Sequence, residues 1–460
     1  MVRGQLFGRR SPRVGTLLGV LVAIAAPALA GSVFEHERAW EVVTVEGRLF
    51  PAEFRAAVDK LTVSRVSGGV LQPIPFQIDE RDSHGRFALP DGPSASQDES
   101  PGVFDENDLL VFAARDVGEQ AAVPDAAEIR VTDPLTGQSG WVYLRRHRDA
   151  DHTEAVATHD QVARDTVAGS TVARGAVAYD GATDTVHTSW YTLTLGAHTA
   201  SAFAFVGADG RPGRNLLDRL KARVTAHILW GLIEFRRTED DITTTVLAWK
   251  VGPVRMIRRA RLSVNVGYGL SPPKIVMENF LTADTFEGPV VIRLPFDLRY
   301  VFGDITMHIY LDFGALDGHR IFTANREPVP VGCGLPVPDL NDLPADWFGM
   351  TGPLGSFVEA LRVGRTLQTV QRRLYVTASR TPDPPEGVPG NCPGVGYTLT
   401  GWRGIGRGTH QLRLVVRAFD HFTPGDERPF LASFDHPLTV SVATARAGAR
   451  MPGVEGGLSR

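Results

Sequence analysis

The sequence predicts an all-β protein made of antiparallel β-sandwich domains with one or two short helices. Many short segments alternate apolar and polar residues, whereas few segments repeat at helical spacing. The 48 glycines and 31 prolines supply turns between these segments. Because alternation gives a sheet one apolar face, and two such faces bury each other, a sandwich is the expected architecture.

Residues 305–313 show the clearest alternation in the chain. The odd-numbered positions form an apolar face: Ile305, Met307, Ile309, Leu311 and Phe313. The even-numbered positions form a polar face: Thr306, His308, Tyr310 and Asp312. Further strands are expected at residues 71–78, 109–113, 128–132, 141–145, 189–195, 261–266, 373–377, 411–417 and 438–443.

Two longer segments are expected to pair as a hairpin. Residues 223–237 and 243–251 both have strand character, and the acidic turn at 238–241 separates them. Helical spacing is confined to short stretches. These stretches are residues 54–61, 216–220 and 352–363.

The 460 residues exceed what one hydrophobic core usually supports, so several regions are expected. A stretch rich in Asp, His, Thr and Ala, with little apolar periodicity, separates two strand-rich parts. The expected regions are a signal peptide at 1–30, an N-terminal β domain at 31–150, a linker and hairpin region at 151–215, a large C-terminal β-sandwich domain at 216–444 and a disordered tail at 445–460.

The first 30 residues have the organisation of a secretory signal peptide. Four arginines precede an apolar run from Val14 to Ala26, and Ala28-Leu29-Ala30 offers a small-x-small cleavage site. A signal anchor is the alternative, because the run is only slightly shorter than the roughly 20 residues that span a bilayer. Pro27 and the cleavage pattern favour removal. We therefore expect a secreted or periplasmic protein with no transmembrane segment after cleavage.

The net charge and the cysteine content restrict the partners and cofactors that we expect for this protein. Removing the four leader arginines moves the formal charge from −4 to −8, which argues against a general nucleic-acid partner. The two cysteines, Cys333 and Cys392, are expected to form a disulfide in an oxidising compartment. Two buried free thiols are the alternative. No cysteine spacing fits a metal site or a covalently attached haem, so no haem cofactor is expected.

Two acid-rich turns, each beside a strand, are candidates for calcium. Carboxylate and amide oxygens are the ligands that this ion prefers, although the spacing is not that of an EF-hand. The alternative is a pair of turns whose side chains cap their own backbone and need no metal. The candidate calcium ligands are Asp79, Asp82, Asp105, Asn107 and Asp108.

The same region carries a family resemblance. The motif Pro75-Phe76-Gln77-Ile78-Asp79, followed by Asp-x-Asn-Asp-x-Leu-Val-Phe at 105–112, resembles the N-terminal module of poorly characterised secreted bacterial β-sandwich proteins. Some members of that group have been linked with polysaccharide breakdown. The resemblance implies a secreted β-rich module with a link to carbohydrate. The resemblance assigns no catalytic residue in this chain.

The polar face of residues 305–313 is a second candidate site. A sheet face with His308, Tyr310 and nearby arginines can bind a sugar. It can also remove a proton beside a uronate carboxylate, with His308 and Tyr310 as general base and acid. The alternative is that any antiparallel sheet with one wet face places polar residues at such positions.

A basic stretch provides the third candidate site. Guanidinium groups bind carboxylates in a bidentate manner, so an acidic glycan is one expected ligand. The alternative is pairing with the acidic turn at 239–241 across neighbouring strands. The four basic residues are Arg255, Arg258, Arg259 and Arg261.

These features lead to three hypotheses about function. The leading one is an exported β-sandwich protein that binds an extracellular ligand, with carbohydrate as the first candidate. The second is an enzyme that cleaves acidic polysaccharide by elimination or hydrolysis. The third is a structural protein of the cell envelope, whose partner is an envelope component.

Overall fold

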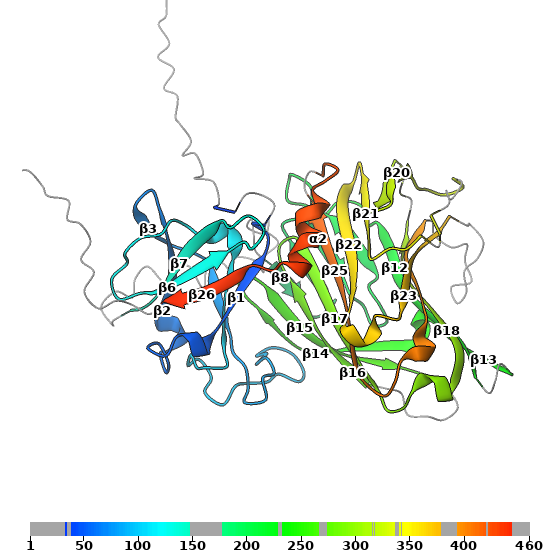
Figure 1. Cartoon of the computed structure of the whole chain (residues 1–460), viewed down its shortest axis with the longest axis horizontal. Coiled ribbons are helices and arrows are strands. Elements are labelled where there is room, and N and C mark those ends of the chain that lie inside the picture. Colours follow the sequence, from blue (N-terminus) through cyan, green and yellow to red (C-terminus); the bar gives the residue numbers. More distant parts are fainter. Residues whose placement is uncertain are drawn as a thin grey trace, which may run out of the picture. The chain divides into compact units, whose positions relative to one another are not determined.

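A computed structural model describes most of the chain as antiparallel β-structure. All strand pairs are antiparallel, and the described part contains one α-helix, which confirms the predicted all-β class (Figure 1). The predicted signal peptide, the tail and Cys392 lie outside the described residues. The described residues are 33–34, 38–147, 177–228, 232–265, 274–314, 316, 318–335, 340–341, 343–378, 393–419 and 422–443.

Two sheets near the N-terminus share one core, which includes Leu110, Phe112 and Ile129. The three-stranded sheet has the order β1 (Val42–Glu46), β5 (Leu109–Ala113), β4 (Phe76–Asp79). The five-stranded sheet has the order β26 (Thr439–Ala443), β6 (Ala127–Thr132), β7 (Ser139–Arg146), β2 (Leu61–Ser67), β3 (Val70–Pro73). The last described strand, β26, thus completes a sheet of N-terminal strands, with Val440 opposite Val131 (Figure 1).

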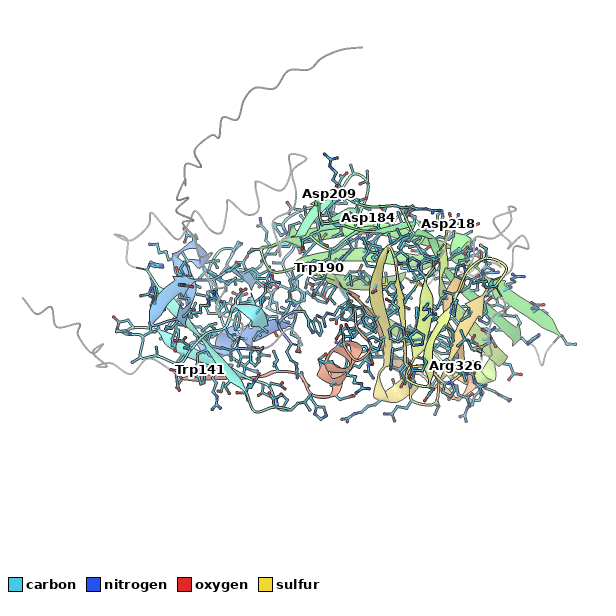
Figure 2. All side chains as sticks on the ribbon, turned by 90° about the horizontal axis from the view of Figure 1, so that it is seen from above. Trp141, Asp184, Trp190, Asp209, Asp218 and Arg326 are labelled. Carbon is cyan, nitrogen blue, oxygen red and sulfur yellow. The ribbon has the colours of Figure 1, made fainter. Side chains whose placement is uncertain are left out.

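A four-stranded sheet follows in sequence. Its order is β11 (Ala202–Phe205), β10 (Tyr191–Thr194), β9 (Thr185–Thr188), β8 (Val177–Asp180). Asp184 lies in the turn between β8 and β9, and Trp190 lies between β9 and β10 (Figure 2). Within the region predicted as linker and hairpin, residues 177–205 therefore form an ordered sheet.

The remaining described strands form a nine-stranded sheet and a second five-stranded sheet. The nine-stranded sheet has the order β14 (Ile242–Val251), β15 (Met256–Val264), β16 (Lys274–Leu281), β17 (Thr285–Leu294), β25 (Gly408–Phe419), β22 (Gly355–Val363), β21 (Trp347–Gly352), β19 (Arg320–Thr323), β20 (Arg326–Pro330). The second five-stranded sheet, called here the β18 sheet, has the order β13 (Ile233–Arg237), β12 (Leu217–Ile228), β18 (Phe302–Phe313), β24 (Gly394–Thr400), β23 (Gln371–Thr377).

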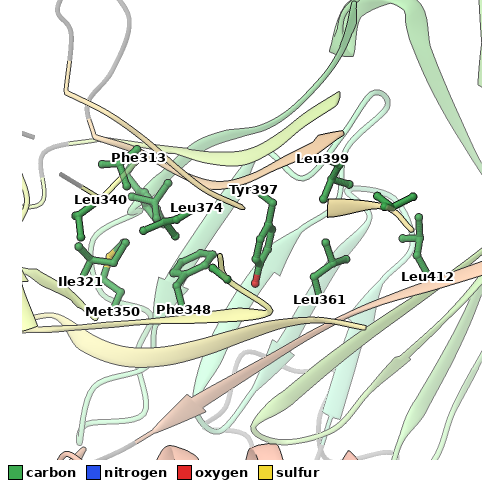
Figure 3. Close-up of a cluster of buried hydrophobic side chains, with 14 of the residues drawn as sticks. Phe313, Ile321, Leu340, Phe348, Met350, Leu361, Leu374, Tyr397, Leu399 and Leu412 are labelled. Atoms are coloured by element: carbon green, nitrogen blue, oxygen red, sulfur yellow. The ribbon is translucent and has the colours of Figure 1, made fainter. Parts of the chain in front are cut away.

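The largest core lies between the nine-stranded sheet and the β18 sheet. Phe313, Leu374 and Leu399 come from the β18 sheet, and Phe348 comes from β21 (Figure 3). Tyr397 is fully buried, and its hydroxyl donates a hydrogen bond to the backbone oxygen of Glu359 at 3.0 Å. These contacts join two apolar sheet faces in the manner of a sandwich.

The predicted helical stretches were wrong in detail. Residues 352–363 form the turn and second strand of the β21–β22 hairpin, and residues 217–220 are the start of β12. Within 54–61 only Val58–Lys60 forms a short 3-10 turn. Val358 and Ala360 pack on one face of β22 while Phe357 and Leu361 pack on the other, so this strand lacks the expected alternation. The α-helix α2 (Glu427–Asp435) was not predicted.

The hairpin predicted around the acidic turn was also wrong. Strand β12 folds back onto β13, with Val224 opposite Arg237. Residues Glu239–Asp241 form a 3-10 turn, η5, closed by a capping box between Thr238 and Asp241. The next strand, β14, pairs with β15 in the nine-stranded sheet. The turn therefore passes the chain from one sheet to the other.

Two further expectations concern the cysteines and the membrane. The described residues contain no free cysteine, but Cys392 lies outside them, so the disulfide with Cys333 stays a prediction. Among the described residues, no helix has the length and apolar character needed to cross a membrane.

Candidate functional site

The polar face of the β18 sheet carries the main candidate site. On β18, Tyr310 lies opposite Lys221 of β12 on one side and Gly396 of β24 on the other. His308 lies in the next row on this face, opposite Arg223 of β12. Since neighbouring residues of a strand face opposite ways, Ile309 and Leu311 point toward the inter-sheet core. The alternation predicted for residues 305–313 is thus present.

An aromatic group occupies the centre of this face. The ring of Tyr375 on β23 lies 4.8 Å from the His308 ring and 4.8 Å from the Tyr310 ring, centroid to centroid. Two glycines of β24 make room for the Tyr310 side chain. A Cβ at Gly396 would lie 2.7 Å from the Tyr310 Cβ, and one at Gly394 would lie 3.0 Å from its ring. The glycines therefore let the Tyr310 ring lie across β24 toward Tyr375.

Two ion pairs flank the aromatic group. The Lys221 ammonium lies 2.6 Å from the Asp312 carboxylate, and both side chains are buried. Arg223 pairs with Glu239 of η5 at 3.1 Å, and Glu239 is fully buried. The Arg223 guanidinium also lies 5.7 Å from the centre of the Tyr310 ring. Each cation is matched by a carboxylate, as buried charges require.

His308 has an altered acidity in this setting. Burial and the positive charge of Arg223 lower the pKa of its imidazole. The ring is therefore neutral at pH 7, with one nitrogen able to donate and the other able to accept. Its Nδ1 lies 3.1 Å from the hydroxyl of Thr398 on β24. We call this set the polar-face cluster: Lys221, Arg223, Glu239, His308, Tyr310, Asp312, Tyr375 and Thr398.

The sequence pointed to His308 and Tyr310 but not to the rest of the cluster. Tyr375 occupies a polar-facing position of the predicted strand at 373–377, and that alternation is the only signal that selects it. Lys221 was missed because it lies between the predicted helical turn at 216–220 and the predicted strand that begins at residue 223. Glu239 was assigned to the acidic turn at 238–241 and to no site.

The basic stretch does not form a single patch. Arg258 is fully buried and binds Asp184 through two nitrogen atoms, one of them at 2.7 Å. It also donates to the side-chain oxygen of Asn279 at 3.0 Å. Arg258 therefore joins β15 and β16 to the β8–β9 turn, and its charge is used within the protein.

The other three arginines have different neighbours. Arg259 pairs with Glu278 at 2.7 Å, and Arg261 is exposed. Arg255 contacts the N-terminal sheets, as described below. Because alternate residues of β15 face opposite sides, Arg258 points away from Arg259 and Arg261. Pairing with acids dominates, as the alternative proposed, but the acids are not those of the predicted turn.

The motif that carries the family resemblance forms a joint between sheets. The Gln77 side-chain oxygen accepts backbone hydrogen bonds from Val254 at 3.1 Å and Arg255 at 3.0 Å, and its nitrogen donates to Asp79 at 2.7 Å. Asp79 in turn binds the Arg255 guanidinium at 2.7 Å. A Cβ at Gly252 would lie 2.2 Å from the Gln77 oxygen, so glycine is required for this approach.

The candidate calcium ligands are occupied by groups of the chain. Asp108 accepts backbone hydrogen bonds from Arg81 and Asp105, both at 3.0 Å, and burial raises its pKa to about 7. Asp79 is paired with Arg255. In the described part of the protein, no group of three or more His, Cys, Asp or Glu side chains is arranged to hold a metal ion. The hydrogen bonds favour the structural alternative, and the calcium site stays a prediction at these residues: Asp79, Asp82, Asp105, Asn107 and Asp108.

Comparisons with known proteins add no family. No protein-family model matches the chain, and no curated protein matches it. An α-mannosidase from Enterococcus faecalis V583 is similar in structure, with 11% identity and a TM-score of 0.46, over 92% of this chain and 48% of the mannosidase. This chain thus spans about half of that enzyme's length. A protein from Escherichia coli K12 that carries the provisional name aldose 1-epimerase aligns with 12% identity and a TM-score of 0.29, over 51% of this chain and 98% of its own. At these values, neither similarity assigns an activity.

Proposed function

We propose that this chain is an exported β-sandwich protein that binds a carbohydrate at the polar-face cluster. The observation that carries the proposal is the packing of Tyr375 against both His308 and Tyr310. Sugars present apolar C–H faces and a rim of hydroxyl groups. Aromatic rings contact the C–H faces, and charged or amphoteric side chains form hydrogen bonds with the hydroxyl groups. Export rests on the leader-like pattern of residues 1–30.

The charges of the cluster favour a neutral ligand over an anion. Lys221 is matched by Asp312, and Arg223 is matched by Glu239. Paired in this way, the two cations leave no large local excess of positive charge. A phosphate or sulfate would need such an excess, whereas hydroxyl groups do not.

A glycan array probed with the exported form of the protein tests this proposal. Tyr375→Ala is expected to weaken binding of the selected glycan about tenfold or more in calorimetry, because it removes the central ring. Tyr300→Ala is the matched control, since Tyr300 is 73% exposed and lies outside the cluster. Circular dichroism checks that both variants are folded. Equal affinity of wild type and Tyr375→Ala for every bound glycan would overturn the assignment.

The neutral imidazole of His308 beside Arg223 favours one second candidate, an elimination reaction on uronate polymers. In that reaction a base removes the proton next to the carboxylate, and a cation stabilises the charge that develops. Unsaturated products absorb ultraviolet light, so mixing the protein with a panel of uronate polymers detects them. Loss of products in His308→Ala would support the enzyme. Glycan binding without products would support the binding protein.

A further inference from the structure

A cavity of about 290 Å³ lies between the nine-stranded sheet and the β18 sheet, and side chains of the four-stranded sheet, among them Tyr191 and Phe203, also line it. Its walls are almost wholly apolar and include Phe286, Val290, Ile309, Leu311 and Leu414. Strand β18 separates it from the polar-face cluster, because Ile309 and Leu311 face inward while His308 and Tyr310 face outward. The proposed carbohydrate site makes no use of this space.

The size of the cavity is unusual for a packed interior. Protein cores leave few voids larger than a water molecule. An apolar cavity of about 150 Å³ is enough to bind benzene, and the present one is about twice as large. Gly288 and Ala222 contribute small groups to its wall. The two sheets therefore do not interdigitate here, and the space suits an apolar ligand larger than a single ring.

The acidic side chain of Glu359 projects into this apolar space. Glu359 lies in the middle of β22, between Phe357 and Leu361, and all three line the cavity. The residue is 2% exposed, and among the described residues its Oε2 atom has no hydrogen-bond partner. Buried polar atoms in native proteins are nearly always satisfied. A carboxyl group left unsatisfied at a cavity wall therefore points to a ligand that bonds to it.

The other charged groups on the wall are already matched. Arg258 binds Asp184 and Asn279, and Asp284 lies 3.7 Å from Arg417. Burial raises the pKa of Glu359 to about 8, so at pH 7 it is a neutral acid that both donates and accepts a hydrogen bond. A neutral oxygen-bearing head is its natural partner, whereas an anionic head would remain unneutralised.

We infer that the inter-sheet cavity binds a single-chain amphiphile of about twelve carbons whose neutral oxygen head, a hydroxyl or a protonated carboxyl, hydrogen-bonds to Glu359. The chain would lie along the apolar side chains of the two sheets. Glu359 would fix the position of its polar end. This inference is independent of the carbohydrate proposal, since the two sites lie on opposite faces of β18.

The first experiment asks whether the cavity is occupied. The probe is N-phenyl-1-naphthylamine, whose fluorescence rises when it enters apolar surroundings, and 1-dodecanol serves as the competitor. Val290→Trp places a ring in the cavity and is expected to weaken probe binding about tenfold. Val291→Trp is the matched control, because its side chain faces away from the cavity, and it is expected to stay within about twofold of wild type. Equal binding in all three proteins would overturn the inference.

The second experiment asks whether Glu359 recognises the head. Glu359→Leu is expected to bind the naphthylamine within about twofold of wild type while its affinity for 1-dodecanol falls about tenfold, because one buried hydrogen bond is lost. Glu359→Gln keeps a donor and an acceptor and is expected to retain most of the dodecanol affinity. Equal dodecanol affinity in wild type and Glu359→Leu would contradict the role of Glu359. Because neither variant touches the polar-face cluster, a negative result here leaves the glycan test intact.

Discussion

The two faces of strand β18 hold polar groups in opposite ways. Outside, the buried Asp312 carboxylate is matched by the Lys221 ammonium at 2.6 Å. Inside, across the cavity that Ile309 and Leu311 line, Glu359 has no cationic partner among the described residues and keeps its proton instead. The difference teaches that this fold buries an acid either by pairing the charge or by removing it. Matched charges suit a polar ligand, and a neutral acid suits an amphiphile.

The largest effect is expected from breaking the outer pair. Asp312→Leu would leave the Lys221 ammonium buried without its carboxylate, which is expected to lower the free energy of unfolding by about 3–5 kcal/mol. The double variant Lys221→Met/Asp312→Leu removes both charges and is expected to recover most of that loss. Urea denaturation measures both. A double variant no more stable than the single one would show that charge pairing is not the cause.

A smaller effect is expected from the pH dependence of the inner acid. Glu359 ionises at about pH 4.5 when unfolded and at about pH 8 when folded, so between these values the unfolded chain binds fewer protons. Wild type is therefore expected to lose stability as the pH rises through this window, by up to about 1.4 kcal/mol per pH unit from this group. Glu359→Gln is expected to show a flatter profile from pH 5.5 to 8. Parallel profiles would mean that Glu359 is already ionised at low pH.

The smallest effect is expected at an arginine that faces solvent. Arg261→Ala is expected to change the free energy of unfolding by no more than about 0.5 kcal/mol, because Arg261 is exposed. Arg258→Ala, on the same strand, is expected to cost several-fold more, since it leaves the Asp184 carboxylate without its bidentate partner. Thermal unfolding of the two variants side by side makes the comparison. Similar losses would contradict the assignment of Arg258 as a buried joint.

Local alternation predicted the parts of the fold that depend on one strand alone. The polar and apolar faces of β18 followed directly from residues 305–313, and the all-β class followed from the number of such segments. Strand β22 was not predicted because Val358 and Ala360 pack against a second hydrophobic cluster, which includes Phe430. The segment is therefore apolar on both faces and does not alternate. The partners of β14 could not be predicted, because pairing is decided by contacts between sheets and not by the intervening turn.

The candidate site was predictable to the same limited extent. His308 and Tyr310 stand out in a single strand, but Tyr375 and Lys221 join them only through the register of four strands. No local pattern reports such a register. The separation of Arg258 from Arg259 and Arg261, in contrast, follows from alternation along β15 and could have been expected from spacing alone. The unsatisfied oxygen of Glu359 is visible only once the surrounding sheets are placed.

Strand β26 sets an order of assembly for the polypeptide. It seals the edge of β6, and Thr439 reaches back to hydrogen-bond Thr132, 307 positions earlier in the chain. During synthesis the β6 edge therefore emerges long before the segment that covers it, and in that interval it is a template for pairing with other chains. Folding of this sheet can finish only after residues 439–443 have been synthesised.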